Sequence, residues 1–63
     1  GQGLTLTREV AYGLYLDASL RTPGDPQRAG KLAEAARLLR GLGPEAQALS
    51  DIRELRGWIA QAG

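Results

Sequence analysis

The chain has 63 residues, a formal net charge of +1 at pH 7, and neither cysteine nor histidine. A chain this short buries only about 60% of the surface that its unfolded form exposes, so its fold is marginal unless something reinforces it. The absence of cysteine excludes disulfide bonds, and a structural zinc site without cysteine or histidine is not expected. Helix packing or association with another chain therefore remains as the source of stability.

The charge balance and the hydropathy pattern limit the classes of partner. A net charge near zero gives no strong attraction to nucleic acid or to an anionic membrane. No run approaches 18 apolar residues, and no basic segment precedes an apolar one as in a signal peptide. We expect a cytoplasmic protein with no membrane partner. It should form a single helical domain over residues 1–63, with a flexible or processed N-terminus at residues 1–6.

The first predicted helix covers residues 8–21 and carries two apolar stripes. Thr7 is the candidate N-cap, and Leu6 before it is placed to pack on Ala11. A period of 3.6 residues puts one stripe at Val10, Ala11, Leu14, Tyr15 and Ala18, and a second, nearly opposite, at Tyr12, Leu16 and Leu20. A surface helix normally carries a single apolar stripe. We therefore expect the second stripe to be covered by another protein.

Gly13 lies beside this second stripe. Glycine inside a helix costs about 1 kcal/mol relative to alanine. It is either tolerated at a solvent-facing site or retained because another helix approaches closely there. The predicted partner-binding residues are Tyr12, Gly13, Leu16 and Leu20.

The second predicted helix covers residues 26–40. Pro23-Gly24 suits the centre of a type II turn, Asp25 is an N-cap, and Pro26 fits the first helical position. The residues expected to face inward are Ala29, Leu32, Ala35, Ala36 and Leu39, and those expected outside are Arg28, Lys31, Glu34, Arg37 and Arg40.

The third predicted helix covers residues 44–61. Gly41 and Gly43 before it are available for a left-handed C-cap, and its stripe is Ala48, Ile52, Leu55 and Ile59, with Trp58 at the edge. An alternative segmentation uses Ser50 as an N-cap and separates a short turn at residues 45–49. No segment alternates with period two, so no sheet is expected. The predicted fold is all-α, a small three-helix bundle or a helical hairpin with a docked N-terminal helix, associating through its first helix.

The composition lacks histidine and cysteine, the residue types that enzymes use most often in catalysis. General acid–base catalysis relies most often on histidine, and covalent catalysis often on cysteine. Ser50 beside Asp51 is better explained as a capping device. The glycines before Pro44 do not resemble a phosphate loop, because no strand precedes them and proline removes a backbone donor. We expect no catalytic residue, no metal site and no cofactor.

These observations favour a non-enzymatic protein-interaction module: an adaptor, a chaperone-like or regulatory protein, or a dimerisation domain cut from a larger protein. Its partner would be a second copy, a different protein or another domain of a parent chain. The alternative is a small three-helix DNA-binding domain that uses the arginine pairs Arg37 and Arg40, and Arg53 and Arg56. Acidic residues on the third helix would oppose DNA phosphates, so we expect no nucleic-acid partner.

Overall fold

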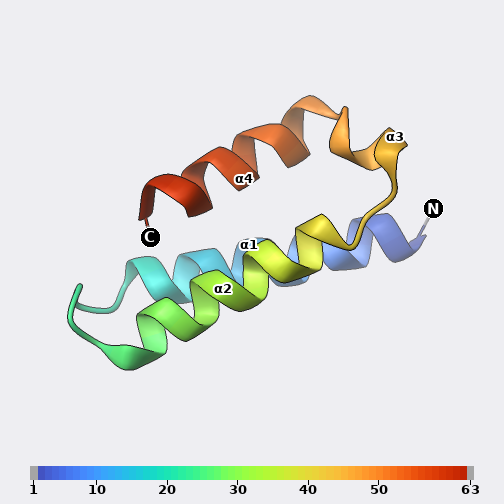
Figure 1. Cartoon of the computed structure of the whole chain (residues 1–63). Coiled ribbons are helices and arrows are strands. Elements are labelled where there is room, and N and C mark those ends of the chain that lie inside the picture. The colour runs from blue at the N-terminus through green and yellow to red at the C-terminus, as the bar shows by residue number, and fades with distance from the viewer. Residues whose placement is uncertain (1, 63) are drawn as a thin grey trace.

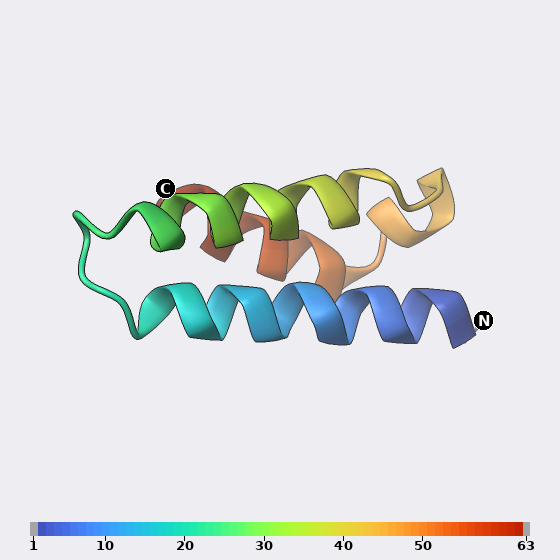
Figure 2. The same ribbon diagram turned by 90° about the horizontal axis from the view of Figure 1, so that it is seen from below.

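The computed structural model describes residues 2–62, which are all-helical with no strand (Figure 1). The helices are α1 (Gln2–Ser19), α2 (Pro26–Arg40), α3 (Pro44–Gln47) and α4 (Ser50–Ala62). The chain runs along α1, returns along α2, and lays α4 over the groove between these two helices (Figure 2). The all-α prediction is confirmed. None of the helices in the described range is long and apolar enough to cross a membrane.

α1 starts earlier than the sequence pattern predicts. It begins at Gln2, so residues 2–6 are helical where a flexible or processed N-terminus was predicted over residues 1–6, and residue 1 lies outside the described residues. Leu4 packs against the core. This contact stabilises a helix that begins before the local capping signal at Thr7. Thr7 therefore lies inside the helix and is no N-cap. Leu6 is 61% exposed instead of packing on Ala11.

The C-terminal end of α1 tightens before the predicted end at Arg21. The backbone N–H of Leu20 is shared between the carbonyls of Leu16 and Asp17, at 3.2 Å each. The N–H of Arg21 then bonds to the carbonyl of Ala18 at 3.1 Å, a three-residue spacing that closes the last turn.

α2 has the predicted bounds and the predicted cap. The Asp25 side chain accepts a hydrogen bond from the backbone N–H of Gln27 at 2.9 Å, and Pro26 follows at the first helical position. The preceding turn is not type II, because no glycine in the described range has a positive φ. For the same reason the predicted left-handed C-cap is wrong: Gly41 ends α2 at φ −73°.

The third predicted helix is broken in two, as in the alternative segmentation. The N–H groups of Ala48 and Leu49 bond three residues back, to the carbonyls of Glu45 and Ala46, and this ends α3. The carbonyl of Leu49 then accepts from Arg53, so Leu49 and not Ser50 holds the capping position. The break turns α4 back over α1 and α2.

The core lies where α1, α2 and α4 meet. Its buried residues are Ala11, Ala18, Leu32, Ala35, Leu39, Ile52, Leu55 and Ile59. Three residues expected to face inward are exposed instead: Val10, Ala29 and Ala48. Val10 lies at the margin of its stripe, where neither α2 nor α4 reaches, and Ala48 falls in the break between α3 and α4. The buried alanines let α1 and α2 approach closely.

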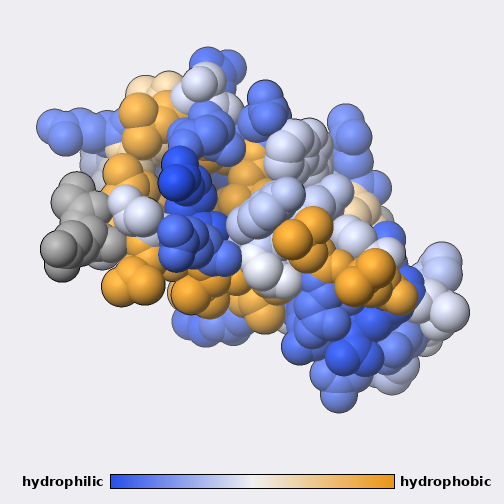
Figure 3. Space-filling model, turned by 180° about the vertical axis from the view of Figure 1, so that it is seen from behind, coloured by the Kyte–Doolittle hydropathy of each residue, from blue (hydrophilic) through white to orange (hydrophobic). Residues whose placement is uncertain are grey.

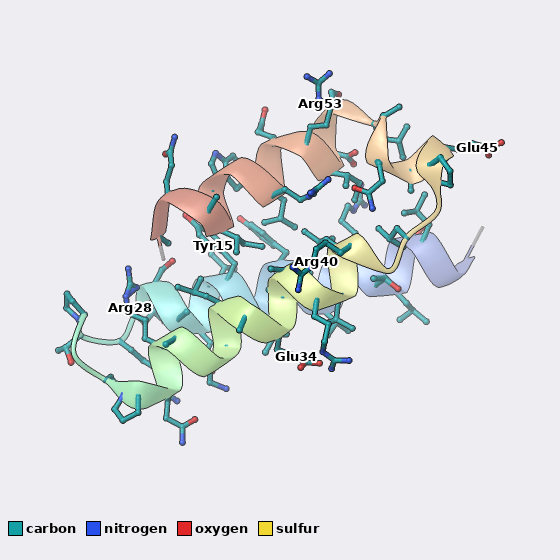
Figure 4. The ribbon with its side chains drawn as sticks, viewed as in Figure 1. Tyr15, Arg28, Glu34, Arg40, Glu45 and Arg53 are labelled. Atoms are coloured by element: carbon teal, nitrogen blue, oxygen red, sulfur yellow. The ribbon has the colours of Figure 1, made fainter. Side chains whose placement is uncertain are left out.

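Arg28 ties two helix ends together from α2 (Figure 4). Its Nη1 donates to the carbonyl of Ala18 at 3.2 Å, and its Nη2 donates to the carbonyl of Ala62 at 2.9 Å. Helix C-termini carry unpaired carbonyls and partial negative charge, so a guanidinium is favourable there. Arg28 is therefore partly buried, contrary to the expectation that it lies outside.

Gln47 performs a similar role at the opposite end of the molecule. Its Nε2 donates to the carbonyls of Leu39 at 2.7 Å and Leu42 at 3.2 Å, which satisfies the end of α2. Its Oε1 accepts from Nη1 of Arg56 at 2.6 Å. These contacts connect α2, α3 and α4.

Two ion-pair clusters connect α1 to its neighbours. Arg8 donates to the carboxylate of Asp51 on α4, and this hydrogen bond holds the pKa of Asp51 below its usual value. Asp17 lies 2.8 Å from Nζ of Lys31 on α2 and 3.4 Å from Nε of Arg21. The hydrogen bond from Lys31 is the main reason that the pKa of Asp17 is also lowered.

Leu55→Ala should destabilise the fold by about 2–5 kcal/mol, because this side chain is 3% exposed and its removal leaves a cavity. Urea or thermal unfolding followed by circular dichroism measures the change. Leu49→Ala, at a leucine that is 42% exposed, is the matched control and should have a much smaller effect. Equal losses for the two variants would contradict the assigned core.

Acid should destabilise the fold partly through Asp17 and Asp51. Because their pKa values are lower in the folded chain than the ordinary 3.8, the stability they contribute is present above that value and is lost as the pH falls through the lowered pKa. The variant Asp17→Asn/Asp51→Asn should therefore lose less thermal stability than wild type between about pH 5 and pH 3. Glu45→Gln, at an exposed carboxylate on α3, should behave as wild type. A double variant as acid-sensitive as wild type would contradict this account.

Candidate protein interface

One side of α1 is covered by neither α2 nor α4. We call outer stripe the residues Leu6, Val10, Gly13 and Leu16 on this side, together with Leu20, which directly follows the last residue of α1. The four large side chains among them are 61%, 51%, 43% and 88% exposed, in chain order. Figure 3 shows this side, with apolar patches distributed along the molecule and hydrophilic atoms between them.

The outer stripe and the buried side of α1 lie opposite each other. At 100° per residue its five positions fall within an arc of about 120° centred on Gly13, whereas Ala11 and Ala18 project from the other side of the helix. A Cβ atom built on Gly13 would meet nothing within 4 Å. Packing inside the chain therefore gives no reason for a glycine at this position.

Two carboxylates lie within the arc of the outer stripe, because at 100° per residue Asp17 falls about 40° to one side of Gly13 and Glu9 about 40° to the other. Asp17, on the side of Val10, is engaged by Lys31 and Arg21. Glu9, on the side of Leu16, is exposed and borders a cavity between α1 and α4. No lysine or arginine lies within the stripe.

Tyr12 lies apart from Leu16 and Leu20, with which the sequence pattern grouped it. Its ring stacks on Tyr15 at a centroid distance of 6.4 Å, and Tyr15, between α1 and α4 in Figure 4, stacks on Trp58 at 6.0 Å. This aromatic row borders a cavity of about 330 Å³ lined by Arg8, Glu9, Tyr12, Asp51, Glu54, Leu55 and Trp58. Tyr12 thus belongs to the seam with α4.

Leu6 and Val10 are the two residues of the stripe that sequence reasoning missed. Leu6 was expected to precede the helix and Val10 to face the core. Once α1 begins at Gln2, the spacing of 6, 10, 13, 16 and 20 becomes a single helical pattern, and this was the available signal.

The four arginines of the DNA-binding alternative do not gather on one surface. Arg40 and Arg56 line a cavity of about 200 Å³ between α2 and α4. Arg53 projects from the outer side of α4 (Figure 4). Arg37 hydrogen-bonds through Nε to Glu34 at 3.2 Å, on the side of α2 turned away from α4.

The pairing of Arg37 with Glu34 also shifts the pKa values of both side chains. Their hydrogen bond raises the pKa of Arg37 and lowers that of Glu34, so each holds the other's charge in place. Because Glu34 offsets part of its positive charge, Arg37 attracts a DNA phosphate less strongly than an unpaired arginine does.

Metal-ligating side chains do not cluster in the described part of the chain. Within residues 2–62, no group of three or more aspartates and glutamates lies close enough together to hold an ion.

Comparison of the chain with protein-family models, with curated proteins and with solved structures finds no match, so the candidate interface stands on its own geometry.

Proposed function

We propose that the chain is a non-enzymatic module, a small helical bundle that binds another protein through the outer stripe of α1. The observation that carries this proposal is the distribution of exposed apolar side chains. Seven large hydrophobic residues are exposed in the described range. Four of them belong to the outer stripe, Leu6, Val10, Leu16 and Leu20, and the other three are Tyr12, Leu49 and Trp58. Exposed apolar side chains gathered on one side of a small protein favour an interaction site there.

The energetics of a short chain support the same proposal. Covering roughly 200–400 Å² of apolar surface at about 25 cal/mol per Å² contributes several kcal/mol before the entropy cost of association. That gain is a large fraction of the stability of a typical domain. An adaptor, a regulatory subunit and a dimerisation domain would all use such a surface.

Leu16→Glu should remove partner binding, because it places a charge in the middle of the apolar contact. The matched control is Leu49→Glu, since Leu49 is 42% exposed and Leu16 is 43% exposed, and Leu49 lies between α3 and α4, outside the outer stripe. Immobilised wild type and Leu49→Glu should retain the same partner from an extract of the producing cells, and Leu16→Glu should retain at least tenfold less. Circular dichroism checks that all three chains remain helical.

Two results would contradict the proposal. One is retention of the same partner by Leu16→Glu at the wild-type level. The other is that wild type retains no protein at all, including a second copy of itself.

A further inference from the structure

The cavity between α1 and α4 is a second surface feature, separate from the contact proposed for the outer stripe. Its volume of about 330 Å³ lies within the range of small-molecule sites. The buried Leu55 contributes an apolar wall, and the exposed rings of Tyr12 on α1 and Trp58 on α4 line the same space. The cavity therefore offers room and apolar surface to a small organic molecule.

The two aromatic rings of the cavity both pack on Tyr15. The ring of Tyr15 stacks on that of Tyr12 with an interplanar angle of 24°, and on that of Trp58 with an angle of 29°. The face of an aromatic ring carries partial negative charge and attracts a cation, and the indole of tryptophan does so most strongly. Rings that are positioned before the ligand arrives lower the entropy cost of binding.

The charged residues of the cavity also favour a cation. Its lining contains the carboxylates of Glu9, Asp51 and Glu54 and the guanidinium of Arg8, a formal net charge of −2, although the whole chain carries +1. Arg8 pairs with Asp51. Within the described residues, neither Glu9 nor Glu54 forms an ion pair. Two carboxylates at an aromatic cavity are therefore available to a positively charged ligand.

We propose that this cavity binds a small organic cation, an alkylguanidinium. A guanidinium is planar, so it can stack on an aromatic ring while its N–H groups donate to a carboxylate. Trp58 and Glu54 supply these two groups, and their spacing of four residues places them side by side on α4. The alkyl stem of the ligand lies against Leu55 and Tyr12.

Other classes of small ligand match the cavity less well. An alkylammonium is a compact and strongly hydrated charge that lacks a plane to stack on a ring. An anion is repelled by the net negative charge of the lining. An uncharged apolar molecule gains the contact with Leu55 and the rings but leaves both free carboxylates without a partner.

Nuclear magnetic resonance titration at physiological salt tests the proposal, with n-butylguanidinium as the probe. The chain has one tryptophan, so its indole N–H gives a single reporter in the cavity, and the Leu55 amide gives a second. We expect saturable shifts of both signals with a dissociation constant of roughly millimolar order. n-Butylammonium should bind at least about threefold more weakly. n-Butanol and butyrate should bind at least about tenfold more weakly.

Three results of this titration would overturn the proposal. One is the absence of saturable shifts with the probe in large excess. The second is binding of n-butanol as tight as that of n-butylguanidinium, because the charge would then contribute nothing. The third is equal binding of n-butylammonium, because the planar group would then be irrelevant.

Matched variants test the assigned residues. Glu54→Gln removes the charge with little change of shape and should weaken probe binding at least about fivefold. Glu45→Gln, at an exposed carboxylate on α3 outside the cavity, should bind as wild type. Tyr12→Leu and Trp58→Leu, read at the Leu55 amide, should each weaken binding at least about threefold, with helix content checked by circular dichroism. Wild-type affinity in Glu54→Gln, or in both ring variants, would overturn the proposal.

Discussion

The close contact between α1 and α2 determines how the rest of the molecule is arranged. Ala11 and Ala18 on α1 and Ala35 on α2 have no exposed surface, so two helix backbones meet over short side chains. Such a contact is narrow, and it covers only one arc of α1. α4 then fills the groove on the same side with Ile52, Leu55 and Ile59. The opposite arc of α1 is left with its leucines and valine exposed.

Polar contacts fix this arrangement mainly at its two ends. Arg28 joins the C-termini of α1 and α4, and Gln47 joins the end of α2 to Arg56 on α4. The pair of Arg8 and Asp51 adds a link along the side of the bundle. An exposed ion pair such as that of Arg8 and Asp51 contributes little stability. None of these contacts covers the outer stripe.

Much of the fold follows from local signals in the sequence. Asp25 and Pro26 predict the start of α2, Pro44 predicts the start of α3, and helical spacing predicts the buried Leu32, Leu39, Ile52, Leu55 and Ile59. The start of α1 was not predictable in this way, because the helix extends to Gln2 through a contact of Leu4 with the core. A local capping signal at Thr7 contains no information about that contact.

The candidate interface was only partly predictable for a related reason. Leu16 and Leu20 were found from their spacing, but the place of Tyr12 depends on Tyr15 and Trp58, and therefore on where α4 packs. Val10 and Ala11 are neighbours in the sequence, and only the position of α2 decides which one is buried. The separation of the four arginines likewise depends on the relative rotation of α2 and α4, which helical periodicity does not determine.

The central claim is that the uncovered side of α1 is the surface through which the chain associates. Amide chemical shifts measured by nuclear magnetic resonance, while the partner retained from the extract is added, test it residue by residue. The account predicts shifts on partner addition at Leu6, Val10, Gly13, Leu16 and Leu20, with the residues of α2 and α4 that lie away from α1 unchanged. Shifts that are absent with the partner in excess, or that centre on Trp58 and the seam with α4, would contradict it.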